Sequence, residues 1–252
     1  MVWDVLNARI LEIWQEHIPP NEEGALAPLF YPDRGKSDLL FVGFNPSFSE
    51  KEAAKRALGI DVSEFYKWKG FQGERLPQMA EIQGRFMKDL YYFKPMQLVA
   101  QEVKMAWAHL DIYPVRKTNQ KKTLSYLKGK TRLKDSLESL FETTIRRLQP
   151  EIIIVANAYA SQCVKRLFDG HLPFDEKVGF HRLQIEGTCA AVFFSSMLSG
   201  QRALDTGSFE RLRWHVRKAA ETLKPTKEDR SRHMSWEAGN GGISLGRSGQ
   251  GL

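Results

Sequence analysis

The sequence predicts an α/β protein in which a central, mainly parallel four-stranded sheet lies between two helical layers, an α/β/α arrangement. Short apolar runs rich in β-branched and aromatic residues, typical of buried strands, recur at 39–43, 107–112, 151–155 and 190–195. Segments with apolar residues at helical spacing separate these runs, which favours parallel pairing through helical crossovers. Of the 252 residues 42% are hydrophobic, enough to fill one large core, and we expect a single domain over 1–224.

The first elements are a helix over 2–17 and the strand at 39–43. The helix is predicted from apolar residues at helical spacing, and Pro19 and Pro20 end it. The strand stops at the turn Gly-Phe-Asn-Pro-Ser, residues 43–47. Ligands of open parallel sheets bind at the carboxyl ends of the strands, so chemistry is expected at this turn. An ordinary strand-to-helix turn is the alternative, since Asn-Pro is a common turn dipeptide.

The middle of the chain adds two helices, a second strand and a basic connector. The helices are expected over 79–93 and from Pro95 to about 103, and the second strand runs into Asp111. Residues 116–134 then hold eight Lys or Arg and no acid. A stretch of one charge beside the active edge suits contacts with phosphate, whereas a solvated surface is the alternative.

The second half repeats the alternation of helix and strand. A helix over 135–148 leads to the strand at 151–155, and the turn that follows begins a helix extending to 168. Two strands, 180–185 and 189–195, flank a short turn. Ser208 is expected to cap a last helix over 209–223. The Gly- and Ser-rich tail, 225–252, is expected to be disordered.

Charge and cysteine content narrow the function classes. The net charge of +7 favours an anionic partner, nucleic acid or a membrane surface, without choosing between them. Two cysteines are too few for a disulfide framework or a four-thiolate cluster, and the six histidines show no metal-ligand spacing. No metal or other cofactor is therefore expected. The low cysteine content fits a reducing compartment, so we expect a cytoplasmic protein. No stretch has the length and apolarity of a membrane span.

Two polar loops, 43–49 and 195–208, each follow an apolar strand, and we expect them to open on one crevice. The first supplies Asn45 and Ser47, and the second supplies Ser196 with Met197 and Leu198 exposed after it. Outside the Gly- and Ser-rich tail, the sequence has no Gly-x-Ser-x-Gly element of the kind found in serine hydrolases, and it has neither a P-loop nor the dinucleotide fingerprint. His109 is expected near the crevice, where a structural core histidine is the favoured interpretation over a functional one.

These loops resemble two motifs of the uracil-DNA glycosylase superfamily. Residues 43–47 are similar to the Gly-x-Asn-Pro motif of its mismatch-specific and single-strand-selective branches, and residues 194–199 are similar to His-Pro-Ser-Pro-Leu-Ser. Phe194 stands where the family has a histidine that hydrogen-bonds the base. Residues 152–160 are similar to the family's strand and Gly-x-x-Ala turn, with Ala156 for the glycine, and Asp111 takes the place of a base-reading asparagine.

The resemblance implies a uracil-DNA glycosylase-like fold and an enzyme that flips uracil or a related damaged base out of DNA and hydrolyses its glycosidic bond. Asn45 would orient the attacking water, and Ser196 is a second catalytic candidate. Leu198 would be the wedge that fills the vacated space. The implied substrate-binding residues are Gly43, Phe44, Pro46, Ser47, Phe48, Asp111, Asn157 and Leu198. The implied DNA-backbone contacts are Lys117, Lys121, Lys122, Ser199 and Arg202.

Phe194 leaves a second interpretation open, because it replaces the histidine expected to stabilise the transition state. The alternative is a catalytically altered member of the fold that binds DNA without releasing a base. A basic adaptor that binds nucleic acid without base flipping is a third hypothesis. The resemblance implies a monomer whose partner is single- or double-stranded DNA.

Overall fold

The computed structural model describes residues 2–48, 53–54, 60–71, 73–185, 187–200 and 203–223. Within these ranges six strands form one sheet in the order β2-β1-β3-β6-β5-β4. The strands are β1 (Leu39–Gly43), β2 (Trp107–Asp111), β3 (Ile152–Ala156), β4 (Phe174–Asp175), β5 (Phe180–Ile185) and β6 (Thr188–Ser195). β2, β1, β3 and β6 pair in parallel, and β5 and β4 add antiparallel pairs at one edge. The expected four-stranded sheet is therefore a mixed sheet of six.

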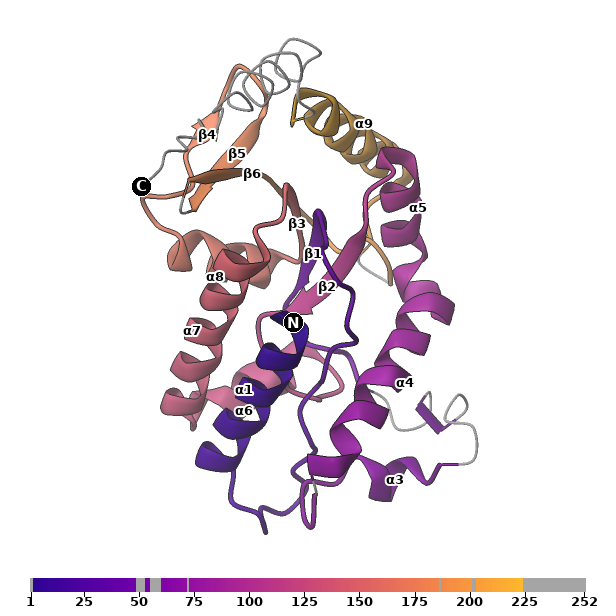
Figure 1. The fold of residues 1–252 in the computed structure, drawn as a ribbon, viewed down its shortest axis with the longest axis vertical. Helices are drawn as coiled ribbons and strands as arrows, with labels where there is room; N and C mark the ends of the chain where they lie inside the picture. The colour runs from indigo at the N-terminus through magenta and orange to yellow at the C-terminus, as the bar shows by residue number, and fades with distance from the viewer. Residues whose placement is uncertain are drawn as a thin grey trace, which may run out of the picture.

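Helices cover both faces of the sheet, as predicted. The α-helices are α1 (Val2–His17), α3 (Val62–Phe65), α4 (Leu76–Asp89), α5 (Lys94–Val103), α6 (Gln120–Lys128), α7 (Thr131–Leu148), α8 (Ala158–Leu167) and α9 (Thr206–Leu223). Two short 3₁₀ helices, η1 (Gly73–Arg75) and η2 (Tyr91–Phe93), flank α4. In Figure 1, α1, α7 and α8 lie on one side of the strands and α4, α5 and α9 on the other.

Alternation along the strands creates two hydrophobic cores. Successive side chains of a strand point to opposite faces. Leu40 and Val42 of β1 therefore join the core under α1, α7 and α8, whereas Leu39 and Phe41 join the core under α5 and α9. Every residue of β1 is buried, which explains its continuous apolar sequence and shows that β1 lies inside the sheet.

Several predicted boundaries change in the structure. The basic connector is not one open stretch, because α6 occupies its centre and α7 begins at Thr131 within it. The cap of the last helix is Asp205, whose Oδ1 accepts from the backbone N–H of Ser208 at 2.9 Å. Ser208 therefore lies inside α9 and does not cap it. Arg202 and the tail at 225–252 lie outside the described residues.

Candidate active site

A cavity of about 310 Å³ lies at the carboxyl ends of β1 and β2. Its walls come from the loop after β1, the end of β2, α4 and η2, so segments far apart in the sequence enclose it. The lining residues are Asn45, Pro46, Ser47, Phe48, Ala53, Gln83, Phe86, Leu90, Tyr92, Phe93, His109, Asp111 and Arg116. Aromatic and aliphatic side chains predominate, with a small set of polar groups among them. This composition is typical of a small-molecule site.

The loop after β1 is fixed to the chain that follows β2. The backbone N–H of Phe48 donates to the carbonyl of Lys117 at 3.2 Å, and Ser47 and Lys117 form a parallel β-bridge. The amide nitrogen of Asn45 donates to the carbonyls of Pro46 (3.0 Å) and Lys117 (3.4 Å). These bonds hold the Asn45 side chain in one orientation. Its carbonyl oxygen accepts no hydrogen bond from the described residues.

Gly43 makes room for a carboxyl group. Gly43 is the register partner of Asp111 in the parallel pair β1 and β2. A Cβ atom on Gly43 would lie 2.3 Å from Oδ1 of Asp111 and 3.0 Å from Nε2 of His109. Any larger residue would therefore displace both side chains. Glycine is required here by close packing, not by a left-handed backbone.

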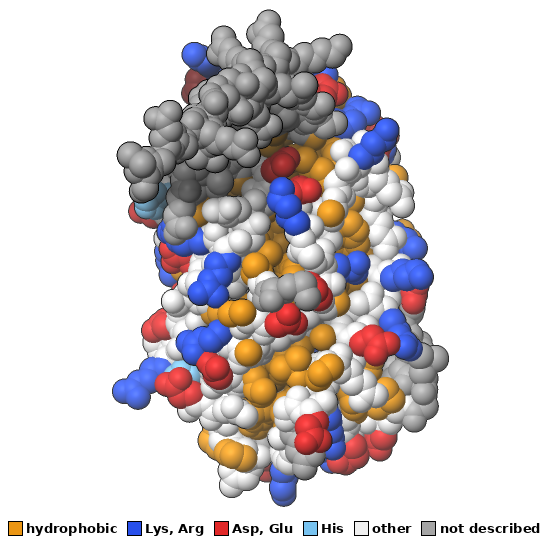
Figure 2. All heavy atoms as spheres, viewed as in Figure 1, with side chains coloured by type: hydrophobic (Ala, Val, Ile, Leu, Met, Phe, Trp, Pro, Cys, Tyr) orange, Lys and Arg blue, Asp and Glu red, His pale blue; other side chains and the backbone are white. Residues whose placement is uncertain are grey.

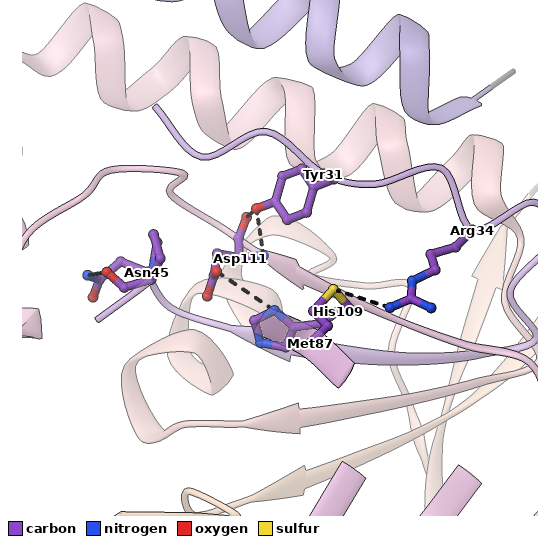
Figure 3. Close-up of polar contacts among 7 residues, drawn as sticks. Tyr31, Arg34, Asn45, Met87, His109 and Asp111 are labelled. Carbon is purple, nitrogen blue, oxygen red and sulfur yellow. Dashed lines mark hydrogen bonds and ion pairs between the residues drawn. The ribbon is translucent and has the colours of Figure 1, made fainter. Parts of the chain in front are cut away.

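His109 and Asp111 lie on the same face of β2 and form the polar end of the cavity (Figure 3). The His109 Nδ1 and Asp111 Oδ2 atoms are 3.8 Å apart, and the residues are 4% and 3% exposed. Both ring nitrogens of His109 and Oδ2 of Asp111 have no hydrogen-bond partner. Since buried polar atoms are rarely left unpaired, these atoms indicate a site for a ligand.

Burial sets the protonation states of these two residues. It raises the pKa of Asp111 to about 8, although the positive charge of Arg116 opposes the shift. It lowers the pKa of His109 to about 4. Both side chains are therefore predominantly neutral at pH 7. A protonated Asp111 presents one donor and one acceptor, as an amide does.

Tyr31 holds the backbone of Asp111 in place. Its hydroxyl accepts from the Asp111 N–H at 3.0 Å and donates to the Asp111 carbonyl at 3.4 Å (Figure 3). Burial, followed by the charge of Asp111, raises the pKa of Tyr31. The hydroxyl therefore stays protonated, and the polar end of the cavity has a rigid support.

Arg116 brings a buried positive charge to the cavity. It is 4% exposed, and its guanidinium lies 4.4 Å from the ring centroid of Tyr66 and 5.4 Å from that of Phe48. Its Nε has no hydrogen-bond partner. In the described part of the chain no carboxylate oxygen lies within 4 Å of the guanidinium. Burial lowers the pKa of Arg116, and the nearby Tyr66, Tyr31 and Asp111 oppose this shift. A guanidinium nevertheless stays charged in proteins.

Four aromatic residues, Phe48, Phe86, Tyr92 and Phe93, form the apolar walls. The ring of Phe93 meets that of His109 edge to face at 5.4 Å, and the ring of Tyr92 meets it at 6.2 Å. The amide of Gln83 is buried at the same cavity. The arrangement suits a flat ring whose polar edge lies against Asp111 and His109.

The structure separates the two loops that were expected to form one crevice. Both loops lie at the end of the sheet formed by the carboxyl ends of its parallel strands, because β1 and β6 each pair in parallel with β3. However, β3 lies between them, which places their ends about 10 Å apart at the usual strand spacing. Asn45 lines the cavity, whereas Ser196 lines a separate groove next to β5 and β6. The expectation of a single crevice is therefore wrong.

The other predicted substrate-binding residues are divided between the cavity and the cores. Pro46, Ser47, Phe48 and Asp111 line the cavity. Phe44 faces the opposite core, where its ring contacts those of Tyr113 at 5.1 Å and Tyr159 at 5.9 Å. Phe44 is thus packed away from the cavity, because adjacent residues beyond β1 point to opposite faces of the sheet.

Leu198 and Asn157 have structural contacts, and Ser199 is buried. Leu198 was expected to be exposed, but it is 7% exposed and packs in the core under α5 and α9. Ser199 is 4% exposed, and its hydroxyl has no partner. Asn157 caps α8 by accepting from the N–H groups of Tyr159 and Ala160, and its Oδ1 also accepts from Gln120.

The basic connector lies next to the cavity. Lys117 follows the cavity residue Arg116, and its ammonium lies 4.5 Å from the ring centroid of Tyr126. Lys121 and Lys122 are exposed on α6. Lysine and arginine side chains are also spread over the face shown in Figure 2, where they alternate with acidic ones. Net charge alone therefore does not identify a binding surface.

Sequence reasoning did not place Arg116 at the cavity and favoured a core role for His109. A usable signal existed for His109, because residues i and i+2 of a strand share a face and Asp111 was already a candidate. Arg116 gave no such signal within a run of basic residues. The aromatic walls contributed by Phe86, Tyr92 and Phe93 depend on how α4 and η2 fold over the sheet, which the local sequence does not specify.

Neither the known protein-family models nor the curated proteins compared with this chain match it. In the described part of the chain, no helix has the length and apolarity needed to cross a bilayer. Nor do the described residues gather three or more His, Cys, Asp or Glu side chains into a cluster that could hold a metal ion.

Proposed function

We propose that the protein is a DNA glycosylase-like hydrolase that binds a flipped-out uracil or a related damaged base in the cavity beside β1 and β2. The main support is that buried side-chain atoms of Asp111 and His109 that have no hydrogen-bond partner share an aromatic cavity with the amide of Asn45. A flipped base would place its ring between the aromatic walls. Its polar edge would supply the missing hydrogen bonds.

The protonation state of Asp111 suits a base that presents an N–H next to a carbonyl. A neutral carboxyl donates to the carbonyl and accepts from the N–H, and uracil and hypoxanthine both offer this pair of groups. An ionised carboxylate offers acceptors alone and would repel the carbonyl. Burial keeps the carboxyl neutral at pH 7.

Hydrolysis in this site requires water on one side of the sugar carbon and stabilisation of the departing base on the other. The free carbonyl oxygen of Asn45 orients the water, whose oxygen bonds to the sugar carbon as the glycosidic bond breaks. The electron pair of that bond leaves with the base, and the proton released by the water neutralises the base. Meanwhile, the Asp111 O–H and the charge of Arg116 stabilise the negative charge developing on the base.

Arg116 also offers a substitute for the family's histidine. Phe194, which stands at that position in the sequence, does not line the cavity, whereas Arg116 does. Positive charge in a buried site acts more strongly than in water, because little solvent screens it. The proposal therefore assigns stabilisation of the departing base to Arg116 and Asp111.

The test is release of a base from single- and double-stranded oligonucleotides that contain uracil, hypoxanthine or a mismatch, detected as strand scission after alkali treatment. Asn45→Ala should lower the rate of base release by about 100-fold or more, because water is no longer oriented, while DNA binding persists. Asn21→Ala, which changes an exposed asparagine elsewhere, is the matched control and should have the wild-type rate.

A catalytically altered DNA-binding protein is the second candidate, and Phe194 is the observation that favours it. The same assay separates the two candidates. Tight DNA binding without release of any tested base would support the altered binder. Base release that survives Asn45→Ala in a folded variant would instead remove Asn45 from the mechanism, and Asp111 would be tested next.

A further inference from the structure

A second hollow, of about 420 Å³, lies at the same sheet edge as the cavity, where β6 ends and β5 begins. It shares no lining residue with the cavity. We call it the β5–β6 groove, and it is defined here by six of its lining residues. These are Phe174, His181, Phe194, Ser196, Arg211 and His215.

Three rings on neighbouring strands form a row along the groove. Phe174 on β4 is the register partner of His181 on β5, and their ring centroids are 5.0 Å apart. The rings of His181 and Phe194 on β6 are 4.9 Å apart. Both contacts are edge to face, so the rings do not stack on one another. Phe174 is 54% exposed, which leaves ring surface available to a planar ligand.

Two positive charges belong to the groove region, one beside Phe194 and one among the lining residues. The ammonium of Lys165 on α8 lies 4.7 Å from the ring centroid of Phe194. Arg211, in the second turn of α9, donates to the hydroxyl of Ser208 at 2.9 Å, which in turn donates to Asp205. In the described part of the chain, no carboxylate lines the groove or lies within 4 Å of the Lys165 or Arg211 charge.

The groove combines aromatic rings, which bind planar groups, with cations and hydroxyls, which bind phosphate. This combination fits a polymer of planar bases joined by phosphates. Base stacking on aromatic side chains and phosphate contacts from Arg, Lys and Ser are the usual means of binding unpaired nucleotides. Duplex bases already stack on each other, and their faces are not available to a protein ring. The chemistry of the groove therefore fits a single strand and not a duplex.

We propose that the β5–β6 groove binds unpaired nucleotides of single-stranded DNA next to the nucleotide held in the cavity. This inference rests on the proposed function in taking the polymer to be DNA. The ends of β1 and β6 are about 10 Å apart at the usual strand spacing, so one strand can cross both sites. Ser196 then contacts the DNA backbone instead of acting in catalysis.

The test measures the affinity of the full chain for fluorescein-labelled oligo(dT) by fluorescence anisotropy. Phe174→Ala should weaken binding about tenfold, the loss of one stacked base, while the salt dependence stays the same, because a neutral ring releases no counterions. Phe174→Trp should retain binding. Tyr91→Ala is the matched control, since Tyr91 is 79% exposed and lines neither the cavity nor the groove.

Arg211→Gln examines the charged part of the groove. It should weaken binding and also reduce the slope of log affinity against log salt by about 0.7, the value for one phosphate contact on a single strand. Affinity for a blunt duplex should change little in Phe174→Ala. Circular dichroism and urea unfolding confirm that each variant is folded.

Three outcomes would overturn the inference. They are wild-type affinity for oligo(dT) in folded Phe174→Ala, an equal loss of duplex binding in that variant, and tighter wild-type binding to oligo(rU) than to oligo(dT). Failure of the proposed function looks different. In that case no base is released from any substrate, yet oligo(dT) binding still depends on Phe174 and Arg211.

Discussion

The cavity beside β1 and β2 and the β5–β6 groove lie at one sheet edge but differ in chemistry. The polar end of the cavity is formed by His109, Asp111 and Arg116, which are 3–4% exposed, and burial keeps Asp111 and His109 neutral. The groove is bordered by exposed Arg211 and Lys165 and by the open ring of Phe174. The first suits one neutral planar group, and the second suits a charged polymer.

The strand order produces this difference. β3 lies between β1 and β6, so the two polar loops cannot enclose one space. Residues of α4 and η2 form one wall of the cavity at the ends of β1 and β2. The antiparallel strands β5 and β4 instead extend the sheet, and the end of β6 stays accessible. Base release and DNA binding therefore depend on different residues, so a substitution can alter one of them without the other.

The largest effect on the cavity is expected from Gly43→Ala. Its Cβ would lie 2.3 Å from Oδ1 of Asp111, and the carboxyl must move. Because displacement by about 1 Å can cost 100-fold in rate, base release should fall by about that factor, while oligo(dT) affinity changes far less. Single-turnover kinetics and anisotropy on the same preparation measure the two effects.

Gly129→Ala is the matched control for that substitution, because nothing lies within 4 Å of its added Cβ. Gly43→Ala should also reduce the free energy of unfolding by about 1–3 kcal/mol through overpacking. The double variant Gly43→Ala with Asp111→Ala should recover part of this loss. If the losses in free energy of unfolding of the two single variants simply add in the double variant, Gly43 and Asp111 do not compete for space.

Asp111→Asn should change the pH dependence of the cavity. The folded-state pKa of Asp111 is raised to about 8 from an ordinary value of 3.8, so from about pH 4 to 8 the unfolded chain releases this proton and the folded chain keeps it. The free energy of unfolding therefore loses about 1.4 kcal/mol per pH unit from this group in that window. Asp111→Asn removes this term.

His109 contributes in the opposite direction. Its folded-state pKa is lowered to about 4 from 6.5, so its contribution to stability is present above pH 6.5 and is lost as pH falls towards 4. Urea unfolding of the wild type and Asp111→Asn at pH 5, 7 and 8 separates the contributions of Asp111 and His109 to the free energy of unfolding. The stability of Asp111→Asn relative to the wild type should rise with pH. A constant difference would contradict the neutral carboxyl.

The same substitution has an activity readout. Base release by the wild type should fall about tenfold per pH unit above pH 8, where Asp111 ionises, because a carboxylate cannot donate to the base. Asp111→Asn retains a donor and an acceptor at all pH values and should lack this decline. A parallel decline in both proteins would assign the titration to another group.

Local sequence predicted most of the elements well. The residues 39–43 and 2–17 form a strand and a helix as expected, because their apolar patterns match those periodicities. The observed sheet includes β4 and β5, which the predicted four-stranded sheet did not. β4 has two residues and no sequence pattern of its own, and the pairing of β5 depends on the path of the chain. The start of α7 was missed because residues 131–134 are mostly polar.

The candidate site was predicted in part. Asn45 was predicted from its position after a buried strand, and Asp111 from its resemblance to a base-reading asparagine at the end of the next strand; both line the cavity. Ser196 was placed with them because the carboxyl ends of parallel strands share one end of a sheet. The strand order separates Ser196 from Asn45 and Asp111, and strand order cannot be inferred from a local sequence pattern. Leu198 was expected to be exposed because it lies in a polar loop. Its burial results from tertiary contacts with the core under α5 and α9.

A smaller effect is expected from reversing charge in the basic connector. Lys121, Lys122 and Lys128 are exposed, and no carboxylate of the described residues lies within 4 Å of them. The triple change to Glu should weaken DNA binding about tenfold at physiological salt and reduce the salt slope by about 2. Base release at saturating DNA should change far less. Unchanged affinity and slope would remove this surface from the binding path.

The most direct test of the account measures two quantities, single-turnover base release and oligonucleotide affinity, on Asn45→Ala and Phe174→Ala using single-stranded DNA that contains uracil. The account predicts opposite patterns. Asn45→Ala should lose base release by a much larger factor than affinity, and Phe174→Ala should lose affinity by a much larger factor than base release. If both variants lose the two quantities in the same proportion, the cavity and the groove do not have separate roles.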